Sequence, residues 1–134
     1  MSEEVVTVRL ARATDVAFAR QAAMKAMTSL GASAIKRTKF VTAVSEIARN
    51  AIVYGGGGVI SFVIVGNGSF RKVVATCSDR GPGIDDIKQA LIDGFTTGNG
   101  LGLGLSGARR LVDRLDVESS RESGTTVILE SAAR

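Results

Sequence analysis

The order of apolar and polar residues divides the chain into short strands and amphipathic helices. Residues 5–10 alternate between apolar and polar side chains, which predicts an edge strand. Apolar residues then recur at helical spacing, which predicts a helix over about 14–29, capped by Thr14 or Asp15, and a second helix over about 33–54. Gly31 and the run Gly55–Gly58 follow these helices and predict where each one ends.

The second half of the chain predicts more strands and two further helices. Residues 59–65 and 71–78 read as strands joined by the turn Gly66-Asn67-Gly68, which is typical of a hairpin. A loop over 79–83, a short helix over 84–92, a glycine-rich polar segment over 93–102 and a helix over 104–115 should follow. The last two strands are expected over 115–120 and 125–130. This order predicts a single α+β domain over 1–134, with helices packed on one face of a sheet.

Composition favours an ordinary cytoplasmic domain. The chain has 134 residues, of which 45% are hydrophobic and only 4% aromatic, so the core must consist mainly of aliphatic side chains. No apolar run approaches the ~20 residues that span a bilayer, and the acidic N-terminus differs from a signal peptide. The lone Cys77 has no partner for an internal disulfide. We therefore expect neither a membrane nor an oxidising compartment.

Charge and residue types narrow the possible chemistry. The net charge of +4 favours anionic ligands, but the basic residues are scattered and lack interleaved aromatics, so nucleic acid is not an expected partner. Histidine is absent, which excludes Ser-His-Asp triads and histidine metal sites. Carboxylates, amides and backbone N–H groups must carry any catalysis. Eight of the 16 glycines lie between Gly81 and Gly107, where backbone is expected to approach a ligand closely.

Glu46 and Asn50 are the first candidate site residues. They lie one helical turn apart and therefore share a face of the second predicted helix. An amide oxygen suits a hydrated Mg²⁺ that bridges to phosphates, and a carboxylate can accept a proton from a nucleophile. A polar pair on the solvent face of an amphipathic helix would look the same in isolation.

Asp79, Gly81 and Gly83 form the second candidate. An Asp that leaves a strand can accept a hydrogen bond from an amino group such as that of adenine, and glycines allow the backbone to pass beneath a flat ring. Asp, Gly and Pro are also the commonest residues of plain turns.

A glycine-rich run and a terminal hairpin complete the candidates. Glycines alternate with Asn and Leu up to the start of the fourth predicted helix, and free N–H groups at a helix start bind anions. A flexible linker is the alternative, although leucines are poor linker residues. Gly124-Thr125 enters the last strand and also suits an ordinary tight turn. The residues of the run that we single out are Gly98, Gly100, Leu101, Gly102, Leu103 and Gly104.

Taken in order, these four motifs resemble the boxes of the GHKL ATPase superfamily, and the resemblance covers essentially the whole chain. It implies a two-layer α/β sandwich of the Bergerat type, with helices on one face of a mixed sheet, that binds ATP and Mg²⁺. It further implies that Glu46 is the catalytic base, that Asn50 holds Mg²⁺, and that Asp79, Gly81 and Gly83 bind adenine. The glycine run would form a lid over the triphosphate, and Thr125 would close the adenine side through a water.

The sequence around these boxes is similar to the switch serine kinases of bacterial stressosomes, the RsbT type. Ser45-Glu46-Ile47-Ala48-Arg49-Asn50 and Gly104-Leu105-Ser106-Gly107 carry this closer resemblance. It implies phosphorylation of Ser or Thr on STAS-domain proteins and, after release from them, activation of a PP2C-type phosphatase. Three alternatives remain open: an anti-sigma factor kinase, a binding module controlled by nucleotide, and the catalytic domain of a sensor histidine kinase. The oligomeric state is not predicted.

Overall fold

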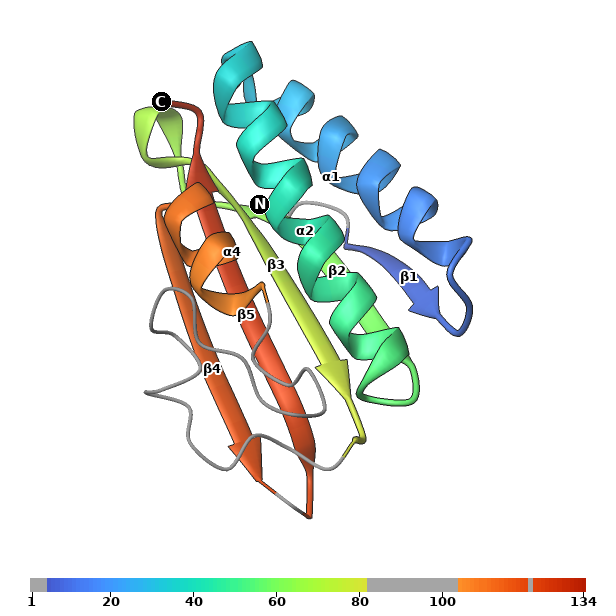
Figure 1. The fold of residues 1–134 in the computed structure, drawn as a ribbon. Helices are drawn as coiled ribbons and strands as arrows, with labels where there is room; N and C mark the ends of the chain where they lie inside the picture. The colour runs from blue at the N-terminus through green and yellow to red at the C-terminus, as the bar shows by residue number, and fades with distance from the viewer. Residues whose placement is uncertain (1–4, 82–103, 121) are drawn as a thin grey trace.

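A computed structural model describes residues 5–81, 104–120 and 122–134 of the chain. In this part of the chain five strands form one sheet in the order β1-β2-β3-β5-β4, and the helices lie on one of its faces (Figure 1). This arrangement confirms the predicted α+β sandwich. The elements are β1 (Val6–Leu10), α1 (Asp15–Leu30), α2 (Ala34–Val53), β2 (Gly58–Val65), the 3-10 turn η1 (Gly68–Phe70), β3 (Lys72–Asp79), α4 (Leu105–Leu111), β4 (Arg114–Ser120) and β5 (Gly124–Ala132).

The expectation of a mixed sheet is wrong for the described strands, because every pairing among them is antiparallel. The connection from β1 to β2 explains this at the first pair. It contains two helices, which run side by side in opposite directions (Figure 1). The pair returns the chain to the point where β1 ended, and Leu10 at the end of β1 therefore pairs with Gly58 at the start of β2. A single crossover helix would have produced a parallel pair.

The predicted hairpins are both present. Strands β2 and β3 pair from Gly58↔Asp79 to Val65↔Lys72, and β4 and β5 pair from Arg114↔Glu130 to Ser120↔Gly124. Strand β5 also pairs with β3, which makes β3 central and leaves β1 and β4 as edges. The side chain of Lys72 forms an ion pair with Glu130 across the β3–β5 pair.

Helices α1 and α2 begin and end close to the predicted residues. Thr14 precedes α1 without a side-chain capping bond, whereas Asp15 Oδ2 accepts hydrogen bonds from the backbone N–H groups of Ala11 and Arg12 at 2.8 and 3.0 Å. Gly31 ends α1 in the left-handed conformation, at φ 82°. Ser33 caps α2, and its Oγ accepts from Lys36 N at 3.2 Å.

Helix α4 is shorter than expected. The prediction over 104–115 is wrong beyond Leu111, because Val112 is extended and β4 already begins at Arg114. Contacts remote in sequence redirect the chain at Asp113, whose backbone N–H donates to Glu130 O at 3.0 Å and whose carboxylate accepts from Lys36 and from Ala132 N. The helix predicted over 84–92 and the glycine-rich segment over 93–102 lie outside the described residues.

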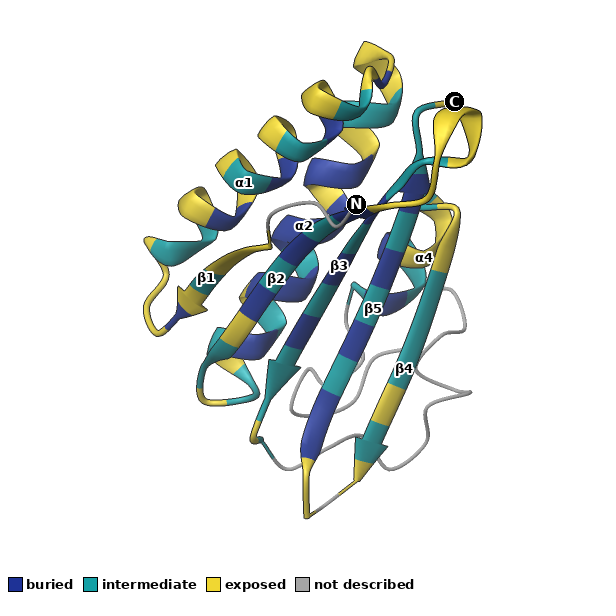
Figure 2. Cartoon of the chain, turned by 180° about the vertical axis from the view of Figure 1, so that it is seen from behind, coloured by how far each residue is buried: buried dark blue, intermediate teal, exposed yellow. Residues whose placement is uncertain are grey.

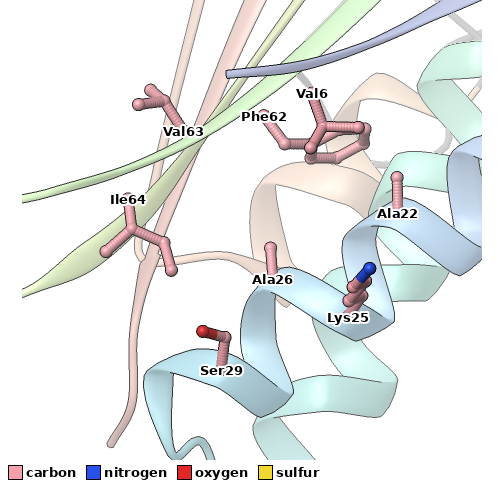
Figure 3. A pocket seen from close by; sticks show the side chains of 8 residues that line it. All are labelled: Val6, Ala22, Lys25, Ala26, Ser29, Phe62, Val63 and Ile64. Atoms are coloured by element: carbon pink, nitrogen blue, oxygen red, sulfur yellow. The ribbon is translucent and has the colours of Figure 1, made fainter. Parts of the chain in front are cut away.

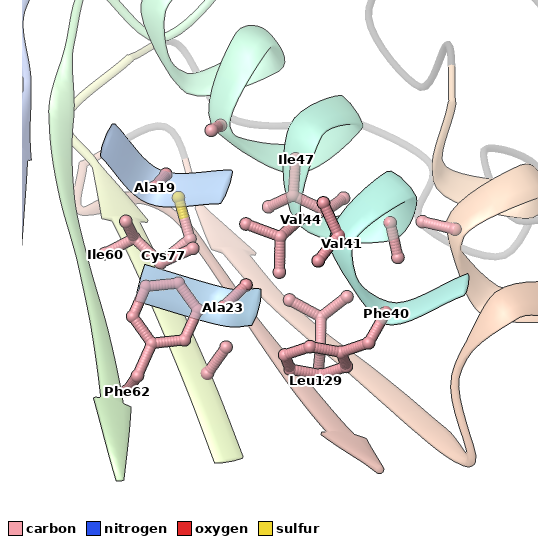
Figure 4. Packing of buried hydrophobic residues seen from close by; sticks show 14 of the residues in the cluster. Ala19, Ala23, Phe40, Val41, Val44, Ile47, Ile60, Phe62, Cys77 and Leu129 are labelled. Atoms are coloured by element: carbon pink, nitrogen blue, oxygen red, sulfur yellow. The ribbon is translucent and has the colours of Figure 1, made fainter. Parts of the chain in front are cut away.

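The core lies between the helices and the sheet and is almost entirely aliphatic (Figure 4). Phe40 on α2 and Phe62 on β2 are its largest fully buried side chains, and Ala19 and Ala23 of α1 pack beside them. Along the sheet, buried residues alternate with more exposed ones, and none of the described helices covers the face opposite α1 and α2 (Figure 2). None of the described helices is both long enough and apolar enough to cross a bilayer.

Candidate functional site

Glu46 and Asn50 lie on α2 and face the start of α4. A Cβ atom placed on Gly104 would lie 2.8 Å from Glu46 Oε2 and 3.7 Å from Asn50 Nδ2. Gly104 also has φ +86°, a conformation that L side chains rarely adopt. The last residue of the predicted glycine run therefore lies against both polar side chains, a contact between the two motifs that the sequence analysis did not specify.

A second residue of α2 holds the other oxygen of the Glu46 carboxylate. Arg49 Nη1 donates to Glu46 Oε1 at 3.0 Å, and the two side chains are 55% and 36% exposed. The carboxylate thus has one oxygen on a guanidinium and the other beside bare glycine backbone. With 36% of its side chain exposed, Glu46 is still accessible to solvent.

The Asp79 carboxylate is fixed by backbone groups at the end of β3. Asp79 Oδ1 accepts hydrogen bonds from Gly81 N at 2.8 Å and from Thr125 N at 3.3 Å. One carboxylate oxygen therefore links the segment after β3 to the start of β5 through hydrogen bonds. Thr125 is buried, and its Oγ1 lies 2.8 Å from Ser119 Oγ on β4.

Three glycines surround Asp79 so closely that no side chain would fit. A Cβ on Gly55 would overlap the Asp79 carboxylate, at 2.6 Å from Oδ2. A Cβ on Gly81 would lie 2.5 Å from Gly55 Cα, and one on Gly124 would lie 2.8 Å from Arg80 Cα. The absence of these side chains leaves the carboxylate between bare backbone segments.

Gly55 joins the two halves of the site. Its backbone N–H donates to Asn50 O at 3.2 Å, while its Cα packs against Asp79. The end of α2 thereby brings Asn50 and Asp79 to neighbouring positions. The sequence analysis interpreted the run Gly55–Gly58 as the end of a helix and did not predict its contact with Asp79. The signal in the sequence was the run of four glycines directly after α2, because glycine allows backbone to pack closely against another segment.

Several predicted site residues cannot be placed. Gly83, Gly98, Gly100, Leu101, Gly102 and Leu103 lie outside the described residues. The structure therefore brings together Glu46, Asn50, Gly104, Asp79, Gly81 and, through its backbone, Thr125.

The described residues offer no metal cage of their own. Among them, no group of three or more His, Cys, Asp or Glu side chains could hold a metal ion. A Mg²⁺ that keeps most of its waters and bridges to phosphates needs only one or two protein oxygens, which Asn50 can supply. Cys77 is not a nucleophile here, because burial raises the pKa of its thiol to about 12.

One surface hollow lies away from this cluster, and a second borders it. The first, of about 260 Å³, opens between α1 and the β1–β2 edge, with Phe62 and Ile64 at its floor and Lys25 at its rim (Figure 3). The other is a broad hollow of about 1000 Å³ lined by Gly55–Gly58, Arg9 and Arg80. It borders Asp79 as well, so Gly55 belongs both to its lining and to the site.

Known proteins match the chain over most of its length. The family described as "Histidine kinase-, DNA gyrase B-, and HSP90-like ATPase" matches residues 35–133. The serine/threonine-protein kinase RsbT of Bacillus subtilis (strain 168) is 36% identical over 120 residues, which is 90% of each chain. The anti-sigma F factor of Geobacillus stearothermophilus is 35% identical over 130 residues, covering 91% of this chain and 87% of that protein.

A solved structure shares the fold. The RsbU and RsbW domains of Rv1364c from Mycobacterium tuberculosis superpose with a TM-score of 0.67 at 22% identity, covering 96% of this chain and 32% of that one. The family match spans α2, the sheet from β2 to β5 and α4, and it therefore includes Glu46, Asn50, Asp79, Gly104 and Thr125. The chain belongs to the histidine kinase-, DNA gyrase B- and HSP90-like ATPase family.

Proposed function

We propose that the chain is a serine/threonine-protein kinase that transfers the γ-phosphate of ATP to a STAS-domain partner in a bacterial partner-switching pathway. One observation carries the proposal: Glu46, Asn50, Gly104 and Asp79 converge around the last turns of α2. A carboxylate that can act as a base thus stands beside an amide that can face phosphates. Similarity to RsbT, which is named a serine/threonine-protein kinase, supports the same reaction.

In this proposal the nucleotide lies across the cluster with its adenine at Asp79. The carboxylate, already held through Oδ1 by Gly81 N and Thr125 N, accepts the exocyclic amine of adenine directly or through a water. The glycines that flank it allow a flat ring to approach the backbone. Adenine recognition thus falls to residues at the strand ends.

The phosphates extend toward α2 and the start of α4. Asn50 would offer an amide oxygen to Mg²⁺, which when bound would offset charge on the phosphates. Glu46 accepts the proton of the acceptor hydroxyl as that oxygen bonds to the γ-phosphorus, and ADP leaves with the electrons of the broken bond. Phosphoryl transfer needs mainly positioning and charge compensation, which these groups supply.

The decisive experiment is phosphate transfer to a natural acceptor. STAS-domain proteins captured on the chain from its native cell should gain label from [γ-³²P]ATP on Ser or Thr. We expect Glu46→Ala to retain ATP and to lose transfer, whereas Glu118→Ala, an exposed carboxylate on edge strand β4, should behave as wild type. An unchanged transfer rate in Glu46→Ala would place the base elsewhere. ATP binding without any transfer would favour a nucleotide-controlled binding module.

An anti-sigma factor kinase is the second candidate, because the chain is 35% identical to a protein named anti-sigma F factor. The same capture experiment separates the two. A sigma factor among the captured proteins would favour the anti-sigma assignment, and STAS proteins together with a PP2C-type phosphatase would favour the switch kinase. In the switch-kinase case, addition of the free chain should raise the activity of that phosphatase in the cytoplasmic extract.

A further inference from the structure

The two oxygens of the Glu46 carboxylate have different surroundings. Oε1 accepts the hydrogen bond from Arg49 Nη1 at 3.0 Å. Oε2 points toward Gly104, where a Cβ would lie 2.8 Å away. The Arg49 guanidinium thus contacts Oε1 and Gly104 lies beside Oε2. With Oε1 held by Arg49, Oε2 faces Gly104.

The pair contributes little to the stability of α2. It joins residues i and i+3 on the helix surface, and its side chains are 36% and 55% exposed. Such pairs stabilise a helix by only about 0.2–0.5 kcal/mol. Removal of Arg49 should therefore leave the fold intact, and any large effect on phosphate transfer would have to arise at the carboxylate itself.

A guanidinium suits the task of orienting a base. It is planar, permanently charged and acts only as a donor, so it cannot take the proton that the carboxylate must receive. With Oε1 engaged, the rotation of the carboxylate about its terminal torsion is restricted, and Oε2 stays directed at the start of α4.

We propose that Arg49 is a positioning residue for the proposed base, holding Glu46 Oε1 so that Oε2 is the oxygen that accepts the proton of the acceptor hydroxyl. This inference rests on the proposed kinase function. In the transfer step the hydroxyl oxygen bonds to the γ-phosphorus, its proton moves to Glu46 Oε2, and the bond from γ-phosphorus to the bridging oxygen breaks toward ADP. Arg49 exchanges no proton and makes no bond to the phosphates.

Kinetics distinguish this role from phosphate binding. Arg49→Gln should lower kcat for transfer from ATP to the captured STAS-domain acceptor by about tenfold, because a misdirected base loses part of its effect, while the KM for ATP stays within about twofold. Arg49→Lys keeps the charge and should recover part of kcat. Arg20→Gln, at an exposed position of α1, is the matched control and should match wild type. A raised KM with unchanged kcat, or an unaltered kcat, would overturn the proposal.

A spectroscopic readout separates this inference from the kinase proposal. In ¹⁵N NMR of the whole chain, the held guanidinium of Arg49 should rotate slowly about its Nε–Cζ bond. Glu46→Gln should release it, whereas Glu118→Gln should not. Slow rotation of the Arg49 guanidinium in a wild type that does not transfer phosphate would contradict the proposed kinase function and support the Arg49–Glu46 contact. Fast rotation of the Arg49 guanidinium in a wild type that does transfer phosphate would contradict only the positioning role of Arg49.

Discussion

Gly104 at the start of α4 and Glu46 on α2 are packed so closely that a methyl group on the glycine would meet the carboxylate, at 2.8 Å from Oε2. The two residues lie far apart in the sequence, and both belong to motifs that the sequence analysis singled out. Their contact means that the start of α4 controls the space in front of the proposed base. A change in either residue should therefore be felt by the other.

Gly104→Ala tests this contact. The left-handed φ should cost about 1 kcal/mol of unfolding free energy, and the added methyl should push the carboxylate aside and lower phosphate transfer by about tenfold. Gly107→Ala is the control on the same helix, because a Cβ there meets nothing within 4 Å. Urea denaturation and transfer assays measure the two effects. Wild-type transfer by Gly104→Ala would show that Glu46 does not depend on the bare backbone.

Asp79→Asn tests the adenine assignment. Oδ1 of the native carboxylate accepts from Gly81 N and Thr125 N, and the remaining oxygen is the one proposed to recognise the amine. The amide removes the charge and turns one acceptor into a donor, so ATP affinity measured by calorimetry should fall at least about tenfold. Asp116→Asn changes an exposed carboxylate on β4 and should retain affinity. Retained ATP binding by Asp79→Asn would refute the assignment.

Local patterns predicted most of the fold because they depend on neighbours in sequence. Alternation and helical spacing gave the strands, the hairpins and the ends of α1 and α2. The predicted end of α4 was wrong because Asp113 accepts hydrogen bonds from Lys36 Nζ and Ala132 N. Both residues are too far away in the sequence for a local pattern to include them. The antiparallel register of β1 was missed for a similar reason, since it depends on how two helices return the chain.

The site was predictable only in part. Motif order identified Glu46, Asn50, Asp79 and Gly104, and their roles as ligands of nucleotide and metal stay predictions. What the sequence did not reveal was how the motifs touch. Gly55 links Asn50 O to the Asp79 carboxylate, and Arg49 holds Glu46 Oε1. Such contacts follow from the packing of a helix end against a strand end, which a linear pattern does not specify.

Asp113 should make stability depend on pH. Its burial raises the pKa, but hydrogen bonds from Ala132 N and Lys36 Nζ, with the charge of Lys36, outweigh that effect and hold the pKa below its usual value. Because the pKa is lower in the folded state, the ionised carboxylate stabilises the fold at pH values above the unfolded-state pKa of about 4. This stabilisation is lost as the pH falls through the folded-state pKa. Asp113→Asn should therefore lower the unfolding free energy by about 1 kcal/mol at pH 7, and the difference should shrink below pH 4.

Denaturant titrations of Asp113→Asn across that pH range measure the effect. Asp116→Asn removes a surface carboxylate paired with Arg114 and serves as the control, with a change of less than about 0.5 kcal/mol expected at every pH. If the difference in unfolding free energy between Asp113→Asn and the wild type does not change with pH, the ionisation of Asp113 does not contribute to stability, which would contradict this prediction.

Ser45 should be a site where a smaller, apolar side chain stabilises the protein. It lies on α2 directly before Glu46, is only 4% exposed, and its Oγ has no hydrogen-bond partner among the residues that the structure describes. A buried hydroxyl without a partner loses its bonds to water on folding, so Ser45→Ala should raise the unfolding free energy by about 1 kcal/mol. Ser29→Ala, at an exposed position of α1, measures the gain from helix propensity alone. If Ser45→Ala gains no more than Ser29→Ala, the buried hydroxyl carries no penalty; if it also lowers phosphate transfer, the hydroxyl has a role at the neighbouring Glu46.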